Sequence, residues 1–210
     1  MQIACLHTAH SNIDVFNAAL KQLGWTDVVL RHSVRPDLLA AVEKAGGLTS
    51  MTATDTIAAL HALSSQADAV LLSCSSLGPS VVEAQKRMSM PVVRADGALA
   101  EAALKGGRKA VVLYTVSATE AVTRAIFTEM ARKHKAAFEL RLVPGAWDLF
   151  KAGDLAGYLA CIAEFADAAY AQGAAVVALG QASMAEAAKL CKRGVPVTSP
   201  IASLLAAAGR

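Results

Sequence analysis

The chain has 210 residues, a formal net charge of +3 and a hydrophobic content of 55%. Such a small charge, with basic residues only in short runs, argues against a nucleic-acid-binding surface, and no apolar run approaches the roughly 18 to 20 residues of a membrane span. The apolar surplus, much of it alanine, therefore predicts a large buried core.

The first residues and the cysteines both indicate an intracellular protein. The opening stretch MQIACLHTAHSN lacks the basic segment and the long apolar run of a secretory signal, so we expect a cytoplasmic location. The four cysteines, Cys5, Cys74, Cys161 and Cys191, are widely spaced and form no CxxC pair. This spacing predicts free thiols, with no disulfide framework and no metal site.

Apolar segments that resemble buried strands alternate along the chain with helical patterns. In chain order these segments are QIACLH, DVVLRH, AVLLSC, PVVRA, AVVLYT, FELRLV, AVVALG and PVTSP. Helical patterns fall near residues 13–23, 36–45, 53–65, 79–88, 96–105, 117–134, 153–172, 183–192 and 200–208. A strand followed by a covering helix is the repeating unit of a parallel sheet, so we predict an α/β fold.

Residues 67–104 and 174–208 repeat the same order of parts. Each segment has an apolar strand, a turn of small residues, a helix, a short strand that opens on proline and an alanine-rich helix. The repeat predicts two similar halves, the first formed by residues 1–94 plus 198–210 and the second by residues 95–197. Open parallel sheets bind ligands beyond the carboxyl ends of their strands, so a pseudo-twofold axis would let the two turns face one cleft.

Cys74 directly follows a predicted buried strand and precedes a helix. Backbone N–H groups and a helix dipole at such a position favour a thiolate, which would make Cys74 a nucleophile or a base. The hydroxyl and amide groups of Ser75 and Ser76 would then hold a carboxylate oxygen. The alternative is that Cys74 fills core space, as free cysteines commonly do, and we expect that role for the other three cysteines.

Four segments together resemble the aspartate/glutamate/hydantoin racemase superfamily: SCSSLG, ALGQASM, VLYTVSAT and LHTAHSN. The resemblance extends in order and spacing over nearly the whole chain. It implies two flavodoxin-like parallel-sheet halves with the active site in the cleft between them. It also implies that two cysteines, one from each half, remove and return the proton beside a carboxylate without a cofactor or a metal.

The resemblance assigns roles to individual residues. Cys74 corresponds to the first catalytic cysteine, and the substrate-binding residues it implies are Thr8, Ser75, Ser76, Thr115, Ser117, Gln181 and Ser183. Gln181 stands where the family has its second cysteine, and an amide is neither an acid nor a base near neutral pH. Racemisation with two bases would therefore need another group, for which we consider the first-half histidines His7 and His10, together with His32.

These observations leave several functions open. The first is a racemase or isomerase acting on amino acids or their derivatives, in which Cys74 transfers a proton at the carbon alpha to a carboxylate. A lyase like arylmalonate decarboxylase needs only one cysteine, a maleate-isomerase-like reaction uses a nucleophilic cysteine, and a non-catalytic protein would only bind the carboxylate. In each case we expect a small carboxylate-bearing partner, no nucleic acid, no membrane, and a homodimer or larger homo-oligomer.

Overall fold

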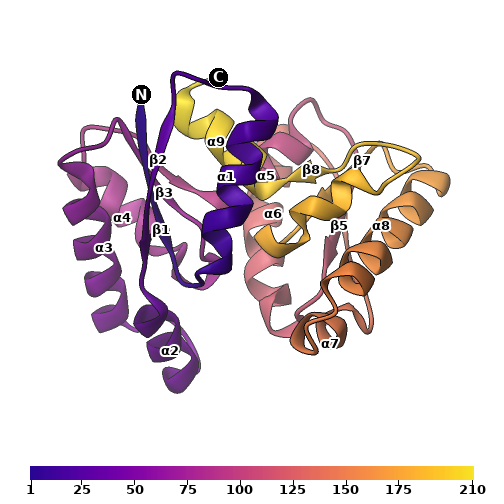
Figure 1. The fold of residues 1–210 in the computed structure, drawn as a ribbon, viewed down its shortest axis with the longest axis horizontal. Coiled ribbons are helices and arrows are strands. Elements are labelled where there is room, and N and C mark those ends of the chain that lie inside the picture. Colours follow the sequence, from indigo (N-terminus) through magenta and orange to yellow (C-terminus); the bar gives the residue numbers. More distant parts are fainter. The chain divides into compact units, whose positions relative to one another are not determined.

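The computed structural model describes residues 1–210, which divide into two compact units. The first unit contains Met1–Ala98 and Pro200–Arg210, and the second contains Leu99–Ser199. Each unit has one four-stranded sheet in which every paired strand is parallel, as Figure 1 shows. The predicted α/β class is confirmed.

The sheet of the first unit has the strand order β2-β1-β3-β4. Its strands are β1 (Gln2–His7), β2 (Val29–Val34), β3 (Ala69–Leu72) and β4 (Val92–Arg94). The helical elements are α1 (Ser11–Leu23), α2 (Pro36–Ala45), α3 (Ser50–Ser64), the 3₁₀ turn η1 (Ser75–Leu77) and α4 (Ser80–Arg87). Two further helices, α5 (Ala95–Leu104) and α9 (Ser199–Ala208), contain the points at which the chain passes from one unit to the other.

The second unit repeats this connectivity with the strand order β6-β5-β7-β8. Its strands are β5 (Ala110–Tyr114), β6 (Phe138–Leu142), β7 (Val176–Leu179) and β8 (Val197–Thr198). Its helical elements are η2 (Ser117–Thr119), α6 (Glu120–His134), α7 (Ala146–Lys151), α8 (Leu155–Ala171) and η3 (Ala182–Lys189). None of the helices in the chain has the length and apolar character that crossing a membrane requires.

Alternation along β1 separates two environments within the first unit. Leu6 packs with side chains of α2, α3 and α4 in one core cluster. Successive side chains of a strand point to opposite faces, so Cys5 and His7 face the other side of the sheet, where the His7 ring lies 5.2 Å from that of Phe16 on α1. Figure 1 shows α1 and the pair α3 and α4 on opposite sides of this sheet.

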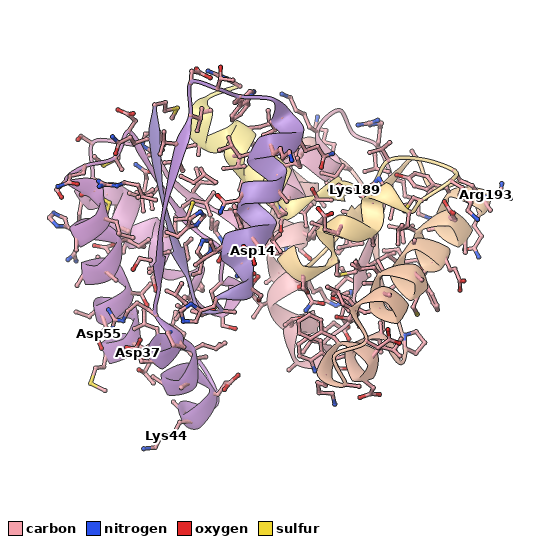
Figure 2. The ribbon with its side chains drawn as sticks, in the orientation of Figure 1. Asp14, Asp37, Lys44, Asp55, Lys189 and Arg193 are labelled. Carbon is pink, nitrogen blue, oxygen red and sulfur yellow. The ribbon has the colours of Figure 1, made fainter.

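Some element boundaries differ from those predicted. A 3₁₀ helix, η3, replaces the α-helix expected over 183–192, and α7 was not expected at all. Helix α3 begins three residues earlier than predicted because Thr49 caps it, its side chain accepting a hydrogen bond from the Thr52 N–H. Asp55, near the start of the helix expected over 53–65, therefore lies beyond the first turn of α3, on the exposed surface seen in Figure 2.

Candidate functional site

Cys74 lies just past the carboxyl end of β3 in the first unit. Its backbone is extended, with φ −95° and ψ 115°, and the side chain is half-buried and forms no disulfide. The three-residue turn η1 follows it directly, while α4 begins only at Ser80. The predicted strand-to-turn position is thus present, but the helix expected to favour the thiolate starts six residues later, so a helix dipole does not act on the sulfur at close range.

An ion pair between Arg94 and Asp96 lies beside Gly78, the residue that ends the turn after Cys74. Arg94 ends β4, and its Nε and one terminal nitrogen each donate to an Asp96 carboxylate oxygen at 2.7 Å. Gly78 lies so close to this guanidinium that a Cβ atom would be 2.5 Å from its terminal nitrogen. A side chain at this position would require the Arg94 guanidinium to shift. Sequence reasoning missed Arg94, whose only signal was its place at the end of the short strand that follows Pro91.

Hydrogen bonds link a series of polar side chains, called here the histidine chain, which begins at Ser73, the residue before Cys74. His7 Nδ1 is 2.8 Å from the Ser73 hydroxyl, and His7 Nε2 is 2.9 Å from His32 Nδ1. His32 Nε2 is 3.2 Å from Asn17 Oδ1, and the Asn12 amide donates to the Ser73 hydroxyl at 3.2 Å. The chain therefore connects the residue before Cys74 to the surface helix α1 through two histidines.

Both histidines of this chain are neutral near pH 7. Burial, and secondly the nearby His32, lowers the pKa of His7 to about 4, and the His7 side chain is fully buried. Burial also lowers the pKa of His32. A neutral imidazole has one N–H donor and one lone pair, so each ring both donates and accepts one hydrogen bond here.

The other predicted residues of the first unit have different exposures. Thr8 is buried and lies at the same sheet edge as Cys74, because Leu6 pairs with Leu72 and each residue comes two positions later. Ser75 and Ser76 are half-buried within η1. His10 is exposed immediately before α1 and takes no part in the histidine chain.

The second unit brings Thr115 and Gln181 together at the equivalent edge of its sheet. Leu113 pairs with Leu179, and the two residues follow them by two positions. The backbone N–H and the hydroxyl of Thr115 donate to Gln181 Oε1 at 2.7 and 2.8 Å. This oxygen is therefore fully engaged, and the amide group of Gln181 can offer only its N–H donors to another molecule.

Ser183 is also held in place, by a residue that the sequence did not indicate. Its hydroxyl lies 2.9 Å from the Tyr158 hydroxyl, and Tyr158 is fully buried. Burial raises the pKa of the Tyr158 phenol, although hydrogen bonds with Ser183 and Thr115 oppose that rise. Ser117, in contrast, is exposed in η2 and does not join this network.

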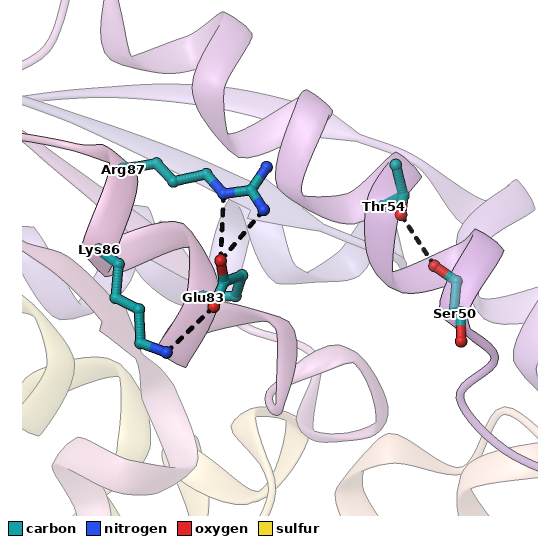
Figure 3. Close-up of polar contacts among 5 residues, drawn as sticks. All are labelled: Ser50, Thr54, Glu83, Lys86 and Arg87. Carbon is teal, nitrogen blue, oxygen red and sulfur yellow. Dashed lines mark hydrogen bonds and ion pairs between the residues drawn. The ribbon is translucent and has the colours of Figure 1, made fainter.

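A hollow of about 390 Å³ on the outer face of α3 and α4 contains none of these residues. It is lined by Thr54, Ile57, Ala58, His61, Ala62 and Arg87. Glu83 holds Arg87 and Lys86 on α4, while the Thr54 hydroxyl donates to the Ser50 carbonyl on α3 (Figure 3). The charges beside this hollow are therefore already paired on α4, and the hollow is separate from both turns.

A protein-family model matches most of the chain. Residues 48–208, which include both turns, match the model of the Asp/Glu/Hydantoin racemase family. The chain belongs to this family. The resemblance to the superfamily is confirmed; the matched residues include SCSSLG, VLYTVSAT and ALGQASM, whereas LHTAHSN precedes them.

Solved racemase structures share the fold at low sequence identity. Allantoin racemase from Pseudomonas fluorescens has a TM-score of 0.71 and 18% identity, covering 100% of this chain and 90% of its own. Aspartate racemase from Picrophilus torridus has a TM-score of 0.68 and 14% identity, covering 99% and 94%. Glutamate racemase from Aquifex pyrophilus has a TM-score of 0.58 and 14% identity, covering 100% and 83%. No curated protein sequence matches the chain.

Proposed function

We propose that this protein is a cofactor-independent racemase or isomerase that transfers a proton at the carbon alpha to a carboxylate, with Cys74 as its acid/base group. The observation that carries this proposal is a free, half-buried thiol at the carboxyl edge of a parallel sheet in a member of the racemase family. Ligands of open parallel sheets bind at that edge.

The proposed step breaks the C–H bond beside the substrate carboxylate. The Cys74 thiolate takes the proton and becomes a thiol, and the electron pair of the broken bond spreads into the carboxylate as an enediolate. The thiol then returns the proton to carbon, which regenerates the thiolate. A single thiol exchanges the proton on one face, whereas inversion of the centre needs a second donor.

Gln181 has a different role in the proposal. Thr115 occupies its amide oxygen, so the remaining N–H donors are suited to a carboxylate or carbonyl oxygen of a ligand. Donors fixed in this way stabilise negative charge that develops on oxygen, such as that of an enediolate. Gln181 therefore contributes binding and charge stabilisation and no proton transfer.

The two predicted second bases, His7 and His10, differ in access. His7 is fully buried and both of its ring nitrogens already face partners, whereas His10 is exposed. If the substrate centre is inverted, we propose His10 as the second base. His10→Gln would then reduce inversion and leave exchange of the proton by Cys74 in place.

A second candidate function is decarboxylation of a malonate-type substrate. The absence of an acid/base group at position 181 favours it, because loss of carbon dioxide leaves an enediolate that one thiol can protonate. The bond to the departing carboxylate breaks, carbon dioxide leaves, and the electron pair forms the enediolate. The Cys74 thiol gives its proton to carbon, and solvent then returns a proton to the thiolate.

The deciding experiment incubates amino acids, hydantoins and arylmalonates in deuterated water with the wild type, Cys74→Ala and Cys74→Ser. We expect deuterium uptake at the α-carbon, or carbon dioxide release for the malonates, to fall by about 10²- to 10⁴-fold in both variants. Cys161→Ser, which changes another half-buried thiol, is the matched control and should retain activity. Binding of a carboxylate with neither deuterium exchange nor carbon dioxide release would overturn the proposal of an enzyme and favour a binding protein.

A further inference from the structure

Three potential metal ligands gather on the sheet face that α1 covers. Cys5 and His7 are two residues apart on β1, and His32 pairs with Cys5 on the neighbouring strand β2. All three therefore point to the same side. The ligand atoms of Cys5, His7 and His32 lie within 4.8 Å of one another.

Each histidine ring has one nitrogen that faces an oxygen atom and one that faces the other ring. His7 Nε2 and His32 Nδ1 face each other at 2.9 Å, while the opposite nitrogens face oxygen atoms of Ser73 and Asn17 at 2.8 and 3.2 Å. In metal centres the nitrogen that is not bound to the ion almost always has such a hydrogen-bond partner, which fixes the ring. The inner nitrogens share one hydrogen bond, which a bound ion could replace.

Asn17 determines which nitrogen of His32 carries the proton. Its Oδ1 can only accept, so His32 carries its proton on Nε2 and turns the lone pair of Nδ1 toward His7. The Ser73 hydroxyl lies near both His7 Nδ1 and the Leu6 carbonyl, at 2.8 and 3.4 Å. When Ser73 donates to Leu6, it can accept from His7 Nδ1–H, and the two inner lone pairs then converge.

From this geometry we propose that Cys5, His7 and His32 form a binding site for a divalent transition-metal ion of the zinc class. One thiolate and two imidazoles are ligands that zinc prefers, and three protein ligands leave a fourth position open. Two nitrogens bound at usual zinc distances are about 3.3 Å apart in a tetrahedral site. The two nitrogens would need to separate by a few tenths of an ångström from their present 2.9 Å, and the rings to turn so that both lone pairs point at the ion.

Protons balance on binding. The Cys5 thiol loses its proton to solvent as the sulfur–metal bond forms, and the His7 proton moves from Nε2 to Nδ1, where Ser73 accepts its hydrogen bond. The bound ion therefore replaces the hydrogen bond between the two rings. Sequence spacing concealed this site, because its ligands come from two neighbouring strands and form no compact motif.

The test uses the full chain, stripped with a chelator and titrated with Co²⁺. The expected result is one ion per chain with a tetrahedral visible spectrum and a thiolate-to-cobalt charge-transfer band. Cys5→Ala should abolish that band, and Asn17→Ala should weaken binding about 10- to 100-fold, because it removes the partner that orients His32. Cys161→Ala and Cys74→Ala, the matched thiol controls, should retain the band.

Two results would overturn the proposal: a wild-type protein that retains no Co²⁺, or a charge-transfer band that disappears in Cys74→Ala and survives in Cys5→Ala. If Cys5→Ala does not fold, X-ray absorption of the zinc-loaded wild type decides the matter. One sulfur and two imidazoles around the ion would support the site, whereas a shell of oxygen alone would exclude it. The outcome does not depend on whether Cys74 is catalytic.

Discussion

The Cys74 turn of the first unit and the Gln181 turn of the second occupy equivalent places in their sheets but carry different chemistry. Each residue follows the third strand of its unit by two positions, beside a threonine that directly follows the first strand. In the second unit Thr115 binds Gln181, whereas no hydrogen bond joins Thr8 to Cys74. The same backbone frame thus presents a free thiol in one unit and an anchored amide in the other.

The residues that precede Cys74 and Gln181, Ser73 and Gly180, also differ between the two turns. Ser73 leads from the first turn to His7 and His32, whereas its counterpart Gly180 has no side chain. Both residues donate a backbone hydrogen bond to the first strand, Ser73 to Leu6 at 3.1 Å and Gly180 to Leu113 at 2.8 Å. The proposed proton transfer therefore falls to the first turn, whereas the second turn has fixed hydrogen bonds.

Gln181→Cys gives the second turn the residue type of the first and should have the largest effect. A thiol would supply the acid/base group that the amide lacks, so we expect inversion to rise about 10²-fold relative to exchange. Chiral chromatography and deuterium incorporation, measured on the same samples, give the two rates. An unchanged ratio, with Cys74 still required, would show that position 181 does not contact the reacting carbon.

The pH dependence of stability should separate the two turns next. His7 has a pKa of about 4 when folded against 6.5 when unfolded, so between these values the unfolded chain binds the extra proton. The contribution of neutral His7 to the free energy of unfolding is therefore fully present above about pH 6.5. It is lost as the pH falls toward 4, by about 3 kcal/mol in total. The second turn has no such group, because burial keeps the pKa of Tyr158 above its usual value.

Urea denaturation of wild type and His7→Gln between pH 7.5 and pH 4, with a chelator present, measures this effect. The difference between the two slopes isolates His7 from the carboxylates that titrate in both proteins. Parallel curves would mean that the buried ring accepts a proton without cost, contrary to its burial.

Gly180→Ala should cost more stability than the same change at Gly47, where space is open. A Cβ atom at Gly180 would be 2.8 Å from the Leu113 carbonyl oxygen, a backbone atom that cannot rotate away. We expect a loss of about 1 to 3 kcal/mol in the free energy of unfolding. The control is Gly47→Ala, where a Cβ atom meets nothing within 4 Å. Equal values for the two variants would show that the second turn shifts freely.

The fold was more predictable from the sequence than the surroundings of the turns. β3 and β7 are buried at every position, and strands covered on both faces leave an unbroken apolar run that a single sequence reveals. The histidine chain left no such signal, since His7, His32 and Ser73 meet only through the pairing of strands far apart in sequence. Tyr158 was missed for a related reason, because nothing in its helical pattern distinguishes a buried phenol that bonds Ser183 from ordinary packing.

Thr115→Val tests the smallest difference, the anchoring of Gln181. The substitution keeps the shape of the side chain and the backbone N–H bond to Gln181 Oε1 but removes the hydroxyl donor. We expect the free energy of unfolding to fall by about 1 kcal/mol, the usual net contribution of one hydrogen bond. Thr115→Ser, which keeps the hydroxyl, should recover most of it. Because the proposed role of the amide is to hold the negative charge that develops on an enediolate, Thr115→Val should also lower kcat for a carboxylate substrate and change KM less. A raised KM with an unchanged kcat would instead limit Gln181 to binding the substrate.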